Sequence, residues 1–212
     1  MAAALAVSWI AVCGSVIPGA SAANKSAEAK SSAAALVAEV RRSFTLHGLP
    51  IPPEIFRDMG DGDMADSGSI WVTVDVAAAI GSNLYFDTIK QNNGWISQKK
   101  EREKTDSEET AYKFLGSTDN GLVVAIAAYS GGGSGDFFTL HILDVAAARA
   151  FDDDGKIYQR INLTNIRNVA LGDRWDGEAR IAKNAVIVTK RGPGVGPDSK
   201  DRPTVTITAV RP

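Results

Sequence analysis

The chain has 212 residues, and its 23 Lys and Arg nearly balance its 25 Asp and Glu to leave a formal net charge of −2. This balance argues against nucleic acid as a partner, because a nucleic-acid-binding domain carries a basic patch or stripe. It also gives no electrostatic reason for the protein to bind anionic lipid.

Residues 1–22 have the composition of a cleavable secretory signal. They contain no charged side chain, residues 2–12 are apolar apart from Ser8, and Ala20-Ser21-Ala22 fits the small-x-small pattern of a cleavage site. We therefore predict cleavage before Ala23 and export to the periplasm or outside the cell. The apolar core is about a dozen residues long, which is too short for a membrane-spanning helix.

Two other interpretations of this segment stay open. A buried N-terminal helix would also be apolar, and Cys13 could carry a lipid anchor. Val12 disfavours the anchor, because that processing requires a small residue before the cysteine. Cleavage before Ala23 would remove the only cysteine of the chain. The mature chain could then form no disulfide, no thiolate zinc site and no cysteine nucleophile.

A short amphipathic helix is predicted at residues 32–42, after a flexible segment that starts at residue 23. Its apolar residues recur at helical spacing and are Leu36, Val37, Val40 and Phe44. The proline-rich residues 48–53 predict an extended segment, because proline fixes φ and disfavours helix before it. Residues 58–68 are rich in Asp and Gly and predict a loop.

Apolar runs then predict strands through the rest of the chain. The predicted strands cover residues 70–76, 94–98, 112–116, 122–129, 137–143, 157–163, 179–189 and 204–210. The run at 122–129 lacks polar alternation, which predicts burial on both faces of a sheet. The run at 204–210 alternates apolar residues with threonines. The dense charge run at 99–110 predicts a solvated loop or hairpin tip.

Turn sequences separate several of these strands, at residues 119–121 and 152–155. About seven to nine short strands favour a mainly β fold, an antiparallel sandwich or barrel-like sheet with one short N-terminal α-helix. We divide the chain into a signal peptide at 1–22, a flexible segment with the helix at 23–44, and a single β-rich domain at 45–212.

Common catalytic and metal-binding templates do not fit the chain. The glycine-rich residues 131–136 lack the final Gly of a nucleophile elbow, and residues 61–66 lack the Gly of an EF-hand loop. His141 lies within a predicted strand on the same face as Thr139 and Leu143, which is typical of a structural residue. The sequence therefore predicts no catalytic residue, no metal site and no cofactor. Looser calcium binding by the acidic loop stays an alternative.

Three unusual loops stand out, at residues 130–138, 171–177 and 192–198. In the first loop, four of the six residues at 131–136 are glycines. A glycine loses more backbone entropy on folding than any other residue, so we expect a close approach or a positive φ there. The candidate binding residues belong to the first two loops and are Gly132, Gly133, Ser134, Gly135, Asp136, Asp173, Arg174 and Trp175.

Asp173 and Arg174 also have a structural interpretation, in which one of them braces the glycine loop. A side chain at either position could satisfy exposed amides or carbonyls of residues 131–135. Neighbouring residues on a strand point to opposite faces, so we expect no ion pair between Asp173 and Arg174.

Residues 112–210 contain an ordered set of motifs. A strand is followed by Gly-Gly-Ser-Gly at 132–135 and an aromatic strand, then by Leu-Gly-Asp-Arg at 171–174, then by a Gly-Pro…Asp loop and a last strand. In this order they resemble the LppP/LprE-type secreted bacterial lipoproteins. The chain departs from that family at residues 199–203, where relatives often carry paired cysteines, and at its poorly formed lipoprotein site. The resemblance implies a small envelope-associated β domain and transfers no activity.

We expect a non-enzymatic binding or envelope-interaction module, with an envelope protein or glycan as partner, no nucleic acid and no membrane span. One version is an inhibitor-like protein that inserts residues 131–136 into the cleft of a partner. Trp71, Trp95 and Trp175 could stack on a sugar, although core packing is favoured for Trp71. The alternative is a hydrolase that acts on envelope polysaccharide or a related ester through carboxylates that the sequence does not single out. A purely structural role is the third interpretation.

Overall fold

The computed structural model describes residues 32–59, 72–81, 88–102, 106–189 and 204–210. The predicted signal with Cys13, Trp71, most of the acidic loop at 58–68 and the loop at 192–198 lie outside the described residues. No helix within the described ranges is long and apolar enough to cross a membrane.

The N-terminal segment folds into a helix, a small hairpin and a second short helix. The predicted helix is confirmed and spans residues 32–43. The hairpin pairs β1 (Thr45–Leu46) with β2 (Leu49–Pro50), and α2 (Ile55–Asp58) follows. The Glu39 carboxylate joins the helix to the hairpin, because its Oε1 accepts a hydrogen bond from the backbone N–H of Gly48 at 2.7 Å. The helix and the hairpin therefore form one layer.

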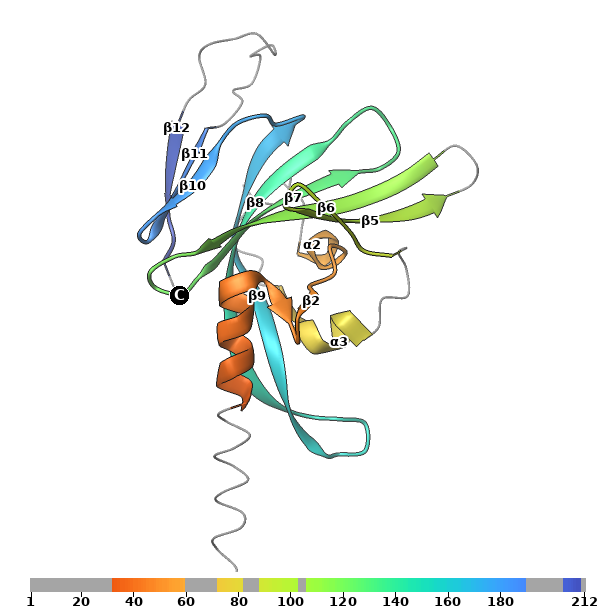
Figure 1. The fold of residues 1–212 in the computed structure, drawn as a ribbon, viewed down its shortest axis with the longest axis vertical. Helices are drawn as coiled ribbons and strands as arrows, with labels where there is room; N and C mark the ends of the chain where they lie inside the picture. Colours follow the sequence, from red (N-terminus) through yellow and green to blue (C-terminus); the bar gives the residue numbers. More distant parts are fainter. Residues whose placement is uncertain (1–31, 60–71, 82–87, 103–105, 190–203, 211–212) are drawn as a thin grey trace, which may run out of the picture.

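A seven-stranded antiparallel sheet forms the centre of the protein, in the order β3-β9-β8-β7-β6-β5-β4 (Figure 1). Its strands are β3 (Thr73–Asp75), β4 (Lys90–Asn92), β5 (Trp95–Arg102), β6 (Asp106–Ser117), β7 (Val123–Ser130), β8 (Phe137–Phe151) and β9 (Ile157–Asp173). From β4 to β9 each strand pairs with the next one along the chain, while β3 pairs with β9 at the far edge. A short helix, α3 (Val76–Gly81), follows β3.

A three-stranded antiparallel sheet packs on one face of this central sheet. It is formed by β10 (Ala179–Ala182), β11 (Ala185–Thr189) and β12 (Thr204–Thr208). The N-terminal segment covers the opposite face (Figure 1). The predicted mainly β fold with antiparallel, sandwich-like sheets and an N-terminal helix is confirmed. The two other helices, α2 and α3, have 4 and 6 residues, too few to leave a periodic pattern in the sequence.

Two hydrophobic cores lie on the two faces of the central sheet. The N-terminal core lies under the N-terminal segment, and the C-terminal core lies between the two sheets. Strand β7 serves both: Val123 and Ala125 face the N-terminal core, while Val124 and Ile126 face the C-terminal core. All four are at most 2 % exposed, so the predicted burial of this strand on both faces is confirmed.

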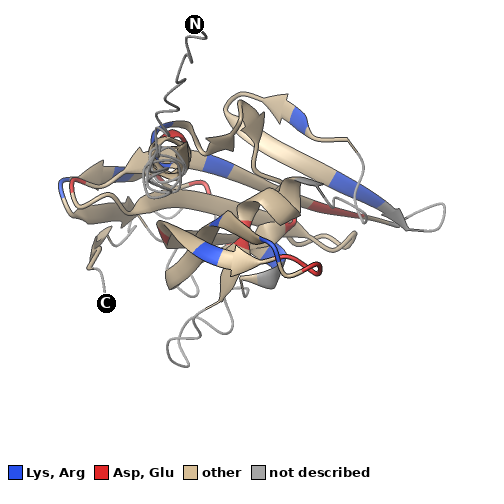
Figure 2. Ribbon diagram, turned by 90° about the horizontal axis from the view of Figure 1, so that it is seen from below, with Lys and Arg blue, Asp and Glu red and all other residues tan. Residues whose placement is uncertain are grey.

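In the view of Figure 2, Lys and Arg are interspersed with Asp and Glu along the described part of the ribbon. Of the two structures predicted for the charge run at 99–110, a solvated loop or a hairpin tip, the hairpin is confirmed, because the run continues β5 and β6 as paired strands. Lys99 and Glu109 are direct partners across these strands, and Lys99 Nζ lies 3.1 Å from Glu109 Oε2. Opposite charges in register stabilise strand pairing, so a charge-rich sequence here forms a hairpin.

Three strand boundaries also differ from the predictions. The predicted strand at 70–76 ends at Asp75, because Val76 begins α3 and the Asp75 carboxylate accepts a hydrogen bond from the backbone N–H of Ala77 at 3.1 Å. Strands β8 and β9 have 15 and 17 residues, roughly twice the predicted lengths. The C-terminal end of β8 pairs with the N-terminal end of β9 to form the β8–β9 arm (residues 146–151 and 157–161), which projects from the sheet (Figure 1). Residues 171–173, predicted as loop, close β9.

Candidate functional site

The glycine loop, residues 131–136, connects β7 to β8 and is largely exposed. Asp173 Oδ1 accepts a hydrogen bond from the backbone N–H of Asp136 at 2.8 Å, and Arg174 Nη2 donates one to the carbonyl oxygen of Ser134. The backbone N–H of Arg174 also donates to the Asp136 carbonyl at 2.7 Å. Both side chains thus brace the glycine loop, in agreement with the structural interpretation of the sequence.

The expected absence of an ion pair between Asp173 and Arg174 is wrong. Arg174 Nη1 lies 3.8 Å from Asp173 Oδ2. The alternation rule fails here because β9 ends at Asp173 and Arg174 has a positive φ of 48°, so its side chain leaves the strand geometry. Both side chains are exposed, and an exposed pair of this kind contributes little to stability.

Trp175 lies apart from the other candidates, because it lines a groove of about 460 Å³ between the two sheets. The glycine loop, Asp173 and Arg174 do not line this groove. The lining comes from β5, β6, β7, β8, β10, β11 and the segment before β10, and comprises Trp95, Lys113, Leu115, Ile126, Phe138, Trp175, Asp176, Gly177, Glu178, Ala179, Arg180, Ile187 and Thr189. The volume falls within the usual range for sites that bind small molecules.

Three aromatic rings, the aromatic row, cross the groove in sequence. The ring centroids of Trp95 and Phe138 are 6.0 Å apart at 77°, and those of Phe138 and Trp175 are 6.1 Å apart at 50°. All three side chains are half-buried, so part of each ring remains accessible. Such spacing and tilt are favourable for aromatic contacts, and the row therefore forms a continuous apolar surface.

Strand pairing brings together the groove residues of the central sheet. Trp95 on β5 is the direct partner of Lys113 on β6, which in turn is the partner of Ile126 on β7. Directly opposed residues of antiparallel strands point to the same face of the sheet. The three side chains therefore line the groove together, and Phe138 joins them from β8.

Trp175 is held in place by the segment around it. Its indole Nε1–H donates a hydrogen bond to the backbone carbonyl of Thr189 at 2.7 Å. A Cβ on Gly177 would lie 2.3 Å from that carbonyl oxygen and 2.6 Å from the indole nitrogen. Only glycine fits there without a shift, so the chain is packed tightly against the Trp175 ring. A ring fixed before a ligand arrives loses little conformational entropy on binding.

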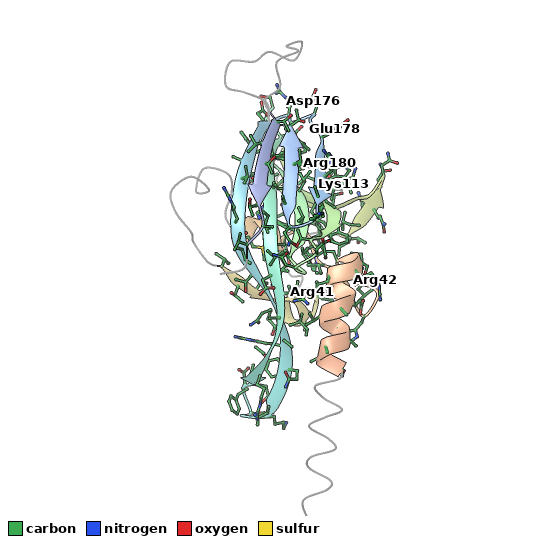
Figure 3. The ribbon with its side chains drawn as sticks, turned by 90° about the vertical axis from the view of Figure 1, so that its left-hand side faces the viewer. Arg41, Arg42, Lys113, Asp176, Glu178 and Arg180 are labelled. Carbon is green, nitrogen blue, oxygen red and sulfur yellow. The ribbon has the colours of Figure 1, made fainter. Side chains whose placement is uncertain are left out.

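Four charged side chains lie on the rim of the groove, and all are exposed. Asp176 and Glu178 lie toward one end, and Arg180 and Lys113 follow in that order (Figure 3). Within the described part of the chain, no salt bridge involves Lys113 or Arg180. The rim therefore presents cationic groups that a ligand can pair with.

His141 lies outside the groove, on the opposite face of the central sheet. It is 1 % exposed, and its ring centroid is 4.9 Å from that of Phe56. Burial lowers the pKa of His141 to about 3, and side-chain hydrogen bonds with Asn168 and Asn165 oppose that shift. A neutral, enclosed imidazole of this kind is a core residue. Among the described residues, no three His, Cys, Asp or Glu side chains are grouped as metal ligands would be.

The sequence identified two residues of the groove. Trp175 was one of the candidate binding residues, and Trp95 was named as a tryptophan that could stack on a sugar. It missed Lys113, Phe138 and Arg180, which come from three different strands. Their only local signal is that they belong to predicted strands. The register that aligns them is a property of pairing between distant segments.

Comparisons with known proteins found no matching family model, no matching curated protein and no matching solved structure.

Proposed function

We propose that the protein is a non-enzymatic binding module of the cell envelope, and that its ligand is a glycan segment that lies on the aromatic row. The observation that carries this proposal is the arrangement of Trp95, Phe138 and Trp175 as half-buried rings in one groove. Aromatic faces provide apolar contact area with few rotatable bonds. A sugar ring presents C–H groups on its face and hydroxyls at its edge, which suits an apolar row with a polar rim.

The envelope part of the proposal rests on the predicted signal at 1–22 and on the resemblance to the LppP/LprE-type lipoproteins, which stays a prediction. The binding part rests on the groove. A hydrolase would need acids that converge in an enclosed site. The two acidic side chains that line the groove, Asp176 and Glu178, are both exposed at its rim. Binding is therefore favoured over hydrolysis.

Tryptophan fluorescence tests the proposal directly. Trp9→Phe and Trp71→Phe leave only Trp95 and Trp175 to emit, and both line the groove. Titration with a neutral tetrasaccharide of N-acetylglucosamine is expected to shift this emission in a saturable way. Trp95→Ala is expected to weaken binding about two- to tenfold, since an aromatic contact contributes about 0.5–1.5 kcal/mol.

Two controls separate the groove from other surfaces. Phe151→Ala removes an aromatic ring on the β8–β9 arm that is 70 % exposed, and it should leave the affinity unchanged. Ser134→Arg tests the version in which the glycine loop enters a partner. If Ser134→Arg binds more weakly while Trp95→Ala binds normally, the binding site is the glycine loop and not the groove. The absence of any saturable signal with envelope glycans would overturn the proposal.

A further inference from the structure

The charges on the rim of the groove are segregated along the aromatic row. Asp176 and Glu178 belong to the segment that carries Trp175 at one end of the row. Lys113 is the cross-strand partner of Trp95 at the other end. The charge of the rim therefore changes from acidic beside Trp175 to basic beside Trp95.

Arg180 adds a second cation toward the basic end. It lies on β10, which contacts β6, the strand of Lys113. Side-chain sticks show the order Asp176, Glu178, Arg180 and Lys113 along the rim (Figure 3). Neither cation has a salt-bridge partner in the described part of the chain. Two exposed cations that line one groove and form no salt bridge with the described residues favour an anionic ligand group.

We propose that the glycan is acidic and lies in one direction, with a carboxylate held by Lys113 and Arg180 and its uncharged end beside Trp175. This inference rests on the proposed function, because it assigns the charge and the orientation of a ligand on the same aromatic row. The guanidinium of Arg180 can bind a carboxylate through two parallel hydrogen bonds. The exposed carboxylate of Glu178 repels a carboxylate at the opposite end, so the reversed orientation is disfavoured.

The expected preference is modest because both cations are exposed. An exposed ion pair contributes about 0.2–1 kcal/mol, so two of them correspond to an affinity ratio of about two- to thirtyfold. The ratio should decrease as salt is raised, because the screening length falls to about 10 Å at 0.1 M ionic strength and to about 3 Å at 1 M.

A matched pair of probes tests the inference. An oligosaccharide of N-acetylglucosamine that ends in a single glucuronate has one carboxylate at one end, and its methyl ester has the same rings without the charge. Titration of the Trp9→Phe, Trp71→Phe chain at low salt should give a Kd about two- to thirtyfold lower for the acid. The double substitution Lys113→Gln, Arg180→Gln should bring the ratio of the two Kd values close to one. Glu178→Gln should raise the affinity for the acid.

The control must remove the same net charge elsewhere. Arg149 lies on the β8–β9 arm and Lys156 in its turn, and neither residue lines the groove. The control is therefore the double substitution Arg149→Gln, Lys156→Gln. This pair should retain the preference for the acid. Equal binding of acid and ester by the unsubstituted chain, or a preference that survives Lys113→Gln, Arg180→Gln, would overturn the inference while the proposed function stands. If neither probe nor the neutral tetrasaccharide binds a folded chain, both proposals fail.

Discussion

On its N-terminal face the seven-stranded sheet is covered by a helix, a hairpin and α2, and Tyr112 and His141 there are 1 % exposed. On the opposite face the three-stranded sheet covers only part of the same strands, and the aromatic row stays half-buried. Alternate residues of β6 and β8 supply both faces. The composition of these strands therefore does not decide which face binds; the extent of the covering layer does.

The aromatic side chains of the two faces illustrate this difference. Phe44 lies 5.1 Å from Tyr112, 5.7 Å from Phe114 and 6.0 Å from Phe56 between ring centroids, inside the N-terminal core. The aromatic row has similar centroid distances but an open side. Rings enclosed on all sides stabilise the fold, whereas rings with an open side retain contact area for a ligand.

The largest effect is expected from breaking the closed face. Phe44 is 1 % exposed, and Phe44→Ala should lower the free energy of unfolding by about 3–5 kcal/mol, through lost burial and the cavity left behind. Urea unfolding measures this loss. Phe151→Ala, on the exposed arm, should change stability by less than about 0.5 kcal/mol. Equal effects of the two substitutions would contradict the assignment of the closed face.

The closed face should also make stability depend on pH. The pKa of His141 is lowered to about 3 by burial, so between about pH 3 and 6.5 the unfolded chain binds a proton that the folded chain does not. Protonation of His141 therefore does not reduce the free energy of unfolding above about pH 6.5. As the pH falls below that value, the free energy of unfolding decreases by up to about 1.4 kcal/mol per pH unit. His141→Leu should remove this component from unfolding curves at pH 4.5 and 6.5. An unchanged pH dependence in that variant would exclude the effect.

A smaller effect is expected from the wall of the open face. Gly177→Ala should lower stability by about 1–3 kcal/mol, because the new Cβ would collide with the Thr189 carbonyl and the Trp175 ring. The emission of Trp175 should move to longer wavelength as the ring loosens. Gly133→Ala is the matched control, since nothing lies within 4 Å of a Cβ there. A stable Gly177→Ala chain with unchanged emission would show that Trp175 is not held as described.

The smallest effect is expected at the glycine loop. Asp173→Asn and Arg174→Ala should each lower the free energy of unfolding by about 0.5–1 kcal/mol, because each weakens one exposed hydrogen bond to the loop backbone. The corresponding decrease in Tm is a few degrees at most. If neither substitution lowers Tm, the two side chains do not brace the loop, and a role in binding gains support.

Sequence patterns were sufficient where a short segment carries its own signal. Helical spacing from Leu36 to Phe44 predicted a helix at 32–42, which the structure shows at 32–43, and the apolar run at 122–129 predicted a strand buried on both faces. The threonines of β12 are exposed, as its alternation indicated. The sequence also predicted that either Asp173 or Arg174 braces the glycine loop, and the structure shows that both side chains do.

The sequence by itself determined the mainly β class, the turns at 119–121 and 152–155 and the tryptophans available to the groove, since local periodicity and turn chemistry act within a few residues. Only the tertiary structure decided that the charge run is paired strand rather than loop and that β8 and β9 extend into an arm. It also decided that Lys113, Phe138 and Arg180 meet Trp95 and Trp175. These outcomes depend on strand register and on how far one sheet covers another, which are set by contacts between segments distant in the chain.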